Sequence, residues 1–133
     1  MMILTIDGRE LSSLEITRYT PKFEVLDMEG TGRSKAPGWD MIRAPGGIIC
    51  NFAVVIFSTR TDNPDYIHLM DTFYSFGGRE FVQVAHRDMI NRLWDQEMYY
   101  VVDGIDIRKF EDGFAYTGDL TVRFIAKKGR GYA

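Results

Sequence analysis

The chain has 133 residues, of which 45% are hydrophobic and 14% aromatic, and its formal net charge is −3. This length and apolar content predict one folded domain spanning residues 1–133 and argue against a disordered chain. The mild negative charge argues against a nucleic-acid binder held by phosphate contacts, and a single cysteine excludes an internal disulfide.

Neither a secretory signal nor a membrane helix is expected. Residues 1–7 lack a basic region followed by an apolar stretch. No window approaches the roughly 18 uninterrupted apolar residues that a membrane helix needs. We therefore expect a soluble protein made in the cytoplasm.

Short strands and tight turns are predicted for the first 28 residues. The dipeptide Asp7-Gly8 suits the positive φ angles of a two-residue hairpin turn. Alternation of apolar and polar residues over 14–19 predicts a half-buried strand. Pro21 separates this strand from a further one at residues 23–28.

Residues 29–47 are predicted to form a long loop, because they contain five glycines and two prolines and lack sustained periodicity. Loops of this length in a compact domain usually serve a function or are disordered. Several of its side chains are too apolar for a purely solvated linker. The loop is therefore expected either to fold back on its own domain or to act as an interface arm. The candidate interface residues are Arg33, Lys35, Trp39, Met41 and Arg43.

The most apolar run, residues 46–58, predicts the central strand. Read with period two, its faces carry Ile48, Cys50, Phe52, Val54 and Ile56 on one side and Ile49, Asn51, Ala53, Val55 and Phe57 on the other. A strand so apolar on both faces is expected to be covered on both.

A helix is predicted over residues 64–76. Asn63 is suited to the N-cap, and Pro64 and Asp65 are favoured in a first helical turn. An apolar stripe at helical spacing follows, consisting of Tyr66, Leu69, Met70, Phe73 and Tyr74. Gly77-Gly78 ends the helix, and the stripe is expected to cover the sheet that contains the central strand.

The second half of the chain again has a β pattern. Strands are predicted at residues 80–86, from residue 94 onward and at 120–126, whereas residues 88–93 fit a short turn of helix or a loop. Asp103-Gly104 and Asp112-Gly113 each predict a tight hairpin turn. The basic residues that follow position 126 are expected to be a solvated terminus.

Together these elements predict a mainly β, α+β fold. Its form is an antiparallel β-barrel or sandwich with one packed helix over about 64–76 and a long loop over 29–47.

Few residues are of a type and spacing suited to catalysis. Asp65, His68 and Asp71 share a helix surface and could bind a metal, but an ordinary exposed histidine between acids is the interpretation we favour. His86 is expected at the surface or in a turn. Cys50 could pair with a histidine as a nucleophile, but in so apolar a strand we expect a small hydrophobic residue. We therefore predict no enzyme, no catalytic residue, no cofactor and no metal.

Three features are residues 3–8 followed by Leu14-Glu15-Ile16, one helix between strands, and a long glycine-rich basic loop. In these features the chain resembles bacteriophage or prophage tail structural proteins. The family includes tail-tube, distal-tail and tail-terminator proteins. The resemblance implies a non-catalytic β-barrel that forms a homo-oligomeric ring, such as a hexamer, and contacts other tail proteins. It also implies a location in the bacterial cytoplasm during assembly and then in the virion tail.

Two other functions remain open from the sequence. One is a monomeric β-barrel that binds a small ligand in a pocket lined by Phe52, Phe57, Tyr100 and Phe124. The other is an enzyme that uses Cys50 or a histidine. Contacts with membranes or nucleic acid are not expected.

Overall fold

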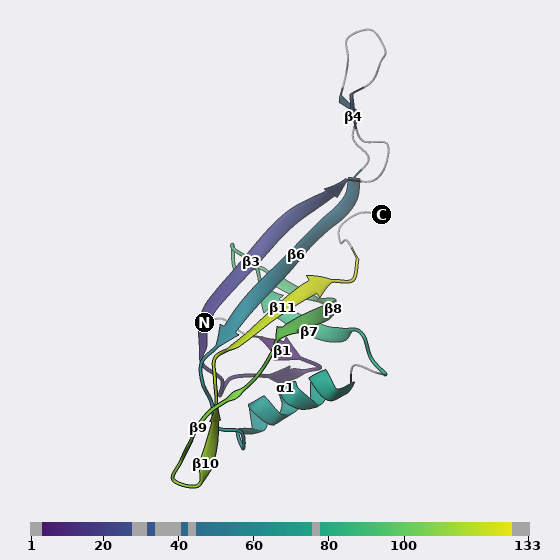
Figure 1. The fold of residues 1–133 in the computed structure, drawn as a ribbon. Helices are drawn as coiled ribbons and strands as arrows, with labels where there is room; N and C mark the ends of the chain where they lie inside the picture. Colours follow the sequence, from purple (N-terminus) through teal and green to yellow (C-terminus); the bar gives the residue numbers. More distant parts are fainter. Residues whose placement is uncertain (1–3, 28–31, 34–40, 43–44, 76–77, 129–133) are drawn as a thin grey trace.

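The computed structural model describes residues 4–27, 32–33, 41–42, 45–75 and 78–128. Its body is a seven-stranded antiparallel sheet with the order β2-β1-β7-β8-β11-β6-β3 (Figure 1). The sheet strands are β1 (Thr5–Ile6), β2 (Arg9–Glu10), β3 (Ile16–Asp27), β6 (Pro45–Ile56), β7 (Val82–Arg87), β8 (Leu93–Asp103) and β11 (Leu120–Ala126). The remaining elements are the helix α1 (Pro64–Tyr74) and two separate strand pairs, β4 (Gly32–Arg33) with β5 (Met41–Ile42) and β9 (Ile107–Glu111) with β10 (Phe114–Thr117).

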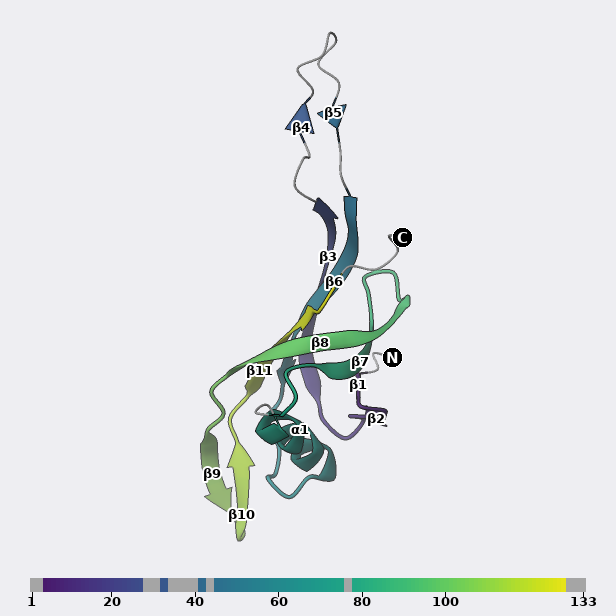
Figure 2. The ribbon, with the colours of Figure 1, turned by 90° about the vertical axis from the view of Figure 1, so that its right-hand side faces the viewer.

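This architecture confirms the predicted fold class in its sandwich-like, open form. The sheet runs from the edge strand β2 to the edge strand β3, and across the described residues it does not close into a barrel. The helix α1 packs beside the sheet as a second layer (Figures 1 and 2). The helix begins as predicted: the Asn63 side chain accepts hydrogen bonds from the N–H groups of Asp65 and Tyr66, and Pro64 occupies the first turn.

The core lies between the helix and one face of the sheet. The buried hydrophobic residues are Leu4, Ile6, Leu11, Leu14, Phe52, Val54, Ile56, Tyr66, Leu69, Val82, Val84, Met98, Tyr100, Leu120, Val122 and Phe124. At its centre the rings of Phe52 and Phe124 stack with centroids 4.9 Å apart. The Tyr100 hydroxyl donates a hydrogen bond to the Thr72 carbonyl over 3.0 Å, which ties the helix to β8. The predicted stripe is thus partly correct: Tyr66 and Leu69 are buried, but Tyr74 is 82% exposed.

The predicted coverage of both faces of the central strand is only partly correct. β6 is an inner strand between β11 and β3, and on its inner face Phe52, Val54 and Ile56 are almost completely buried. The outer face is buried at Ile49 but only half-buried at Val55, and Phe57 beyond the strand is 45% exposed. The reason is that the helix layer covers one side of the sheet only.

Two of the three Asp-Gly turns form as predicted. Asp7 and Gly8 have φ angles of 51° and 82°, and Asp112 and Gly113 have φ angles of 52° and 82°, as a type I′ hairpin requires. Asp103-Gly104 does not form a hairpin. Instead β8 pairs with β11, so that Val102 lies opposite Val122 and Tyr100 opposite Phe124. That pairing buries two aromatic side chains, a gain that a local turn could not supply.

Pro21 does not divide the first long strand. It lies within β3 opposite Phe52, and β3 continues from Ile16 to Asp27. A proline lacks an N–H donor, but β3 is an edge strand, where alternate N–H groups point away from the sheet and need no partner within it.

The predicted long loop contains regular structure at positions where an irregular chain was expected. Asp27 pairs with Pro45, so residues 45–47 belong to β6. Beyond this point Gly32 and Arg33 of β4 pair with Ile42 and Met41 of β5. The β3–β6 ribbon rises out of the body, and β4 and β5 lie beyond its end (Figure 2).

Candidate assembly surfaces

The polar residues at the start of α1 form contacts that stabilise the fold. The buried Asp65 carboxylate accepts hydrogen bonds from Arg9 Nε (2.8 Å) and from the backbone N–H (2.9 Å) and hydroxyl of Ser13. These bonds, with the Ser13 hydroxyl first, hold the pKa of Asp65 below its usual range. Asp65 therefore joins the helix to the β1–β2 hairpin.

His68 is not the freely exposed residue that we predicted. Its Nε2 lies 2.9 Å from the carbonyl oxygen of Ile6, to which it donates a hydrogen bond. His68 and Asp65 therefore contact separate partners on the β1–β2 segment, while Asp71 is exposed. Within the described ranges no group of three or more histidine, cysteine, aspartate or glutamate residues could hold a metal ion.

His86 is completely buried, which corrects its prediction as a surface or turn residue. The Tyr19 hydroxyl donates to the Arg87 carbonyl and lies 2.9 Å from His86 Nδ1, so Nδ1 carries the proton. His86 Nε2 has no hydrogen-bond partner. Burial lowers the pKa of His86 to about 4, because protonation would place an unpaired charge in the core. The alternation of Val82, Val84 and His86 along β7 is the sequence signal that indicates this burial.

Cys50 is also completely buried, as expected of a small hydrophobic residue. Burial raises the pKa of its thiol, which keeps the sulfur in the weakly nucleophilic neutral form. Three of the four aromatic residues predicted to line a ligand pocket lie together, but they pack in the core. Phe52, Tyr100 and Phe124 fill the core, whereas Phe57 lies on the outside.

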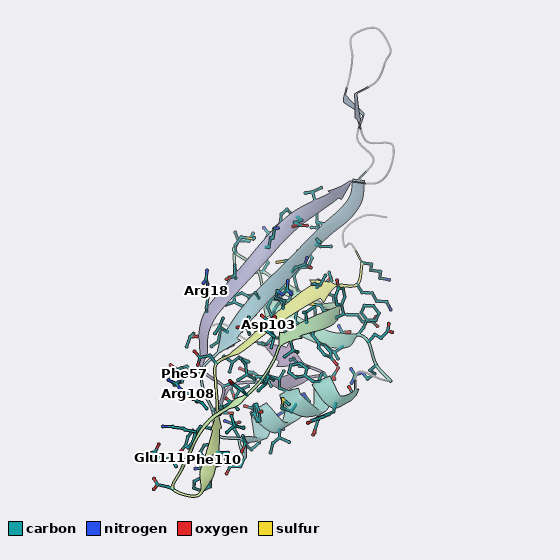
Figure 3. All side chains as sticks on the ribbon, in the orientation of Figure 1. Arg18, Phe57, Asp103, Arg108, Phe110 and Glu111 are labelled. Atoms are coloured by element: carbon teal, nitrogen blue, oxygen red, sulfur yellow. The ribbon has the colours of Figure 1, made fainter. Side chains whose placement is uncertain are left out.

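The β9–β10 hairpin is a large exposed feature that sequence reasoning did not single out. It extends away from the body, with Phe110 and Glu111 near its tip (Figures 1 and 3). The Phe110 side chain is 78% exposed. It shares one face of the hairpin with Ala115, which lies directly opposite. On the other face the Arg60 guanidinium lies 3.4 Å from the centroid of the Phe114 ring, and Phe114 is 40% exposed.

The base of this hairpin is firmly attached. The backbone N–H of Thr117 donates to the Thr59 carbonyl over 2.9 Å, and the Ser58 hydroxyl donates to the Thr117 carbonyl. Gly118 donates to the Asp106 carbonyl over 3.1 Å, and a Cβ at Gly118 would collide with the Asp106 carboxylate. The hairpin therefore projects from the body, is fixed by hydrogen bonds at its base, and carries an exposed aromatic residue, Phe110, near its tip.

A groove lies beside the turn between β7 and β8. Its volume is about 420 Å³, and its lining consists of Phe23, Ile48, Asp88, Met89, Ile90, Arg92 and Trp94. Asp88 shapes the turn: one carboxylate oxygen accepts the N–H groups of Ile90 and Arg92, and the other accepts Trp94 Nε1 over 3.0 Å. The residues predicted as a loop or helical turn are therefore a tight turn, with Ile90 63% exposed beside the groove.

A second depression lies where the hairpin leaves the body. Phe57, Ser58, Arg108, Lys109 and Tyr116 line its volume of about 390 Å³. Figure 3 shows Phe57 and Arg108 here, between Arg18 on the sheet and Phe110 on the hairpin. Lys109 already contacts Glu111 over 2.7 Å and lies over the Tyr116 ring. The Lys109 ammonium group therefore already has an ion-pair partner and an aromatic contact within its own hairpin.

The predicted interface residues of the 29–47 segment are only partly placed. Arg33 and Met41 pair across β4 and β5. Lys35, Trp39 and Arg43 lie outside the described residues. Their role in an interface stays a prediction.

Comparison with known proteins does not identify the chain. No model of a known protein family matches the sequence, and no curated protein matches it. Within the part of the chain that the structure describes, no helix is long and apolar enough to cross a membrane.

Proposed function

We propose that this protein is a non-catalytic structural subunit that associates with copies of itself into a ring. We further propose that the ring is part of a bacteriophage or prophage tail, assembled in the bacterial cytoplasm and retained in the virion. The observation that carries self-association is the β9–β10 hairpin, which is firmly attached at its base and exposes Phe110 to solvent. An exposed aromatic residue on a rigid element is typical of an interface anchor.

The shape of the molecule supports this proposal. Two β-ribbons extend from the body, the β3–β6 ribbon and the β9–β10 hairpin (Figure 2). Neither ribbon contributes its end to the core described above, and Phe23 and Val25 on β3 are exposed as well. Apolar side chains on projecting elements are explained more readily by a partner than by the stability of the monomer.

The edge of the sheet favours association through side chains over strand pairing. β3 is an edge strand, but Pro21 lacks a donor and Lys22 next to it is exposed. Proline and lysine are common devices that prevent strands from adding to a sheet edge. The tail assignment itself rests on the sequence resemblance and on the mainly β fold with one packed helix.

The mass of the protein in solution tests the proposal. Light scattering coupled to size-exclusion chromatography, and native mass spectrometry, should show one fixed multiple of the chain mass over a range of concentrations. Electron microscopy of that species should show closed rings. A monomer at every concentration would overturn the proposal.

Replacement of residues 28–44 by Asn-Gly tests whether the long segment is an interface arm. Asp27 and Pro45 are cross-strand partners, so a two-residue turn should preserve the β3–β6 ribbon. We expect a folded protein, judged by circular dichroism and a urea melt, that no longer assembles. Loss of folding would show that the segment belongs to the core, and retained assembly would show that it is not an arm.

A further inference from the structure

We propose that the Phe110 side chain on the β9–β10 hairpin of one copy docks in the groove beside the Asp88–Arg92 turn of a second copy. This inference rests on the proposed self-association and names the contact that produces it. Below, the knob is Phe110 with Asp112, and the groove is the set of residues that line the 420 Å³ volume described above.

The knob is exposed by the architecture of the hairpin. Arg60 lies over one face of the Phe114 ring, which leaves Phe114 40% exposed, whereas Phe110 has only Ala115 opposite it and is 78% exposed. Asp112 lies two residues from Phe110 at the turn, and it is exposed. The hairpin thus presents an aromatic ring with a carboxylate next to it.

The groove offers the complementary chemistry. Most of its lining is apolar and comes from β3, β6 and the β7–β8 turn. Its volume falls within the range of roughly 300–1,000 Å³ that is usual for pockets that hold small molecules, so it has room for a phenylalanine ring. Arg92 is the cation on its lining, and it is exposed. Hydrogen bonds from Trp94 Nε1 and from two backbone N–H groups lower the pKa of Asp88 on the same lining, and the positive charge of Arg92 helps to lower it. A docked Phe110 could bring Asp112 to this arginine.

The positions of knob and groove forbid contact within one chain. Trp94 of the groove is the second residue of β8, and β8 continues to Asp103, from which the chain enters the hairpin. At about 3.3 Å per residue these nine steps separate the two features by roughly 30 Å. Figure 2 shows the hairpin at one end of β8 and the β7–β8 turn at the other.

This geometry makes the contact head-to-tail. Each copy uses its knob on one neighbour and its groove on the other, which is a heterologous interface. Repetition of such an interface closes a ring when the rotation between copies allows it, and otherwise it builds an open filament. The contact therefore agrees with the ring of the proposed function.

The first experiment compares two exposed aromatic residues. Phe110→Ala removes the knob, and Tyr74→Ala removes a side chain of similar exposure from the outer side of α1. We expect Phe110→Ala to weaken assembly at least about tenfold, as loss of an anchor residue does, and Tyr74→Ala to assemble like the wild type. Circular dichroism and urea melts of both variants confirm that they are folded.

A mixing experiment tests the head-to-tail geometry. Phe110→Ala keeps an intact groove, and Ile90→Glu keeps an intact knob. At a concentration where the wild type assembles and each weakened variant alone is monomeric, their mixture should form a one-to-one heterodimer that grows no further. A heterodimer supports the inference, and its absence with both variants folded overturns it.

Neutralising the two charges provides a test that does not depend on the apolar residues. Asp112→Asn keeps a residue that tolerates the positive φ of this turn position. Arg92→Gln and Asp112→Asn should each weaken assembly, and the double variant should lose less than the sum of the two single losses. If the wild type forms a ring that Phe110→Ala leaves intact, the inference fails and the proposed function stands. If the wild type is monomeric, both fail. Binding of an unrelated protein or small molecule in the groove of a wild-type monomer would likewise overturn the proposed knob-in-groove contact.

Discussion

The core face of the sheet and the β9–β10 hairpin use similar residues in opposite ways. Phe124 of β11 is 1% exposed and stacks on Phe52, whereas Phe110 of β9 is 78% exposed. Both residues lie on antiparallel strands within one chain. An aromatic residue in a strand therefore does not by itself indicate a core, because burial depends on whether another layer covers that face of the sheet.

The two regions also differ in what holds them in place. Tertiary contacts bind the core, including the Tyr100–Thr72 hydrogen bond and the packing of Leu69. The hairpin is held by its own strand pairing and by bonds at its base. Folding explains the apolar residues of the first region, whereas the exposed Phe110 of the second takes no part in the core of the described residues.

The largest expected difference comes from truncating the two phenylalanines. Phe124→Ala should reduce the free energy of unfolding by about 3–5 kcal/mol, because it removes a buried ring and leaves a cavity. Phe110→Ala should change it by no more than about 0.5 kcal/mol. Urea melts at concentrations where the protein is monomeric measure both. A cost of several kcal/mol for Phe110→Ala would place the hairpin in the cooperative core.

A pH titration should sharpen the comparison, because the core contains a buried histidine and the hairpin contains none. The folded-state pKa of His86 is about 4, below its ordinary value of 6.5. The unfolded chain therefore binds the proton first. Protonation of His86 therefore does not reduce the free energy of unfolding above pH 6.5. As the pH drops from 6.5 towards 4, it lowers that free energy by up to roughly 3 kcal/mol.

The variant His86→Leu isolates this effect from the titration of carboxylates. Urea melts between pH 7 and 4.5 should show a weaker pH dependence for the variant than for the wild type. Equal slopes would mean that His86 binds a proton as readily in the folded state as in the unfolded state.

The smallest expected difference concerns two residues on α1. His68→Ala should cost about 1 kcal/mol, because it removes the hydrogen bond to the Ile6 carbonyl. Asp71→Ala on the exposed side should stay within about 0.5 kcal/mol of the wild type. Thermal or urea melts of the two variants provide the comparison. Indistinguishable melts would show that the bond contributes nothing to stability.

The proposed assembly surfaces include features that the sequence alone did not indicate. The 29–47 segment was selected for its length and glycine content, whereas the groove is lined by residues as distant in the chain as Phe23 and Trp94. No local pattern joins such positions. The Asp112-Gly113 dipeptide predicted the hairpin. It did not predict which aromatic side chains of the hairpin would be exposed.

Local chemistry was sufficient for the elements whose stabilising contacts are near in sequence. Adjacent residues were enough to predict the N-cap of Asn63, the Asp7-Gly8 and Asp112-Gly113 turns and the strand at residues 120–126. Only the tertiary structure decided that Asp103-Gly104 leads out of the sheet, that His86 is buried and that much of one face of β6 is only half-buried. Dihedral preferences and capping act over a few residues, whereas burial is set by which distant strand or helix covers a face.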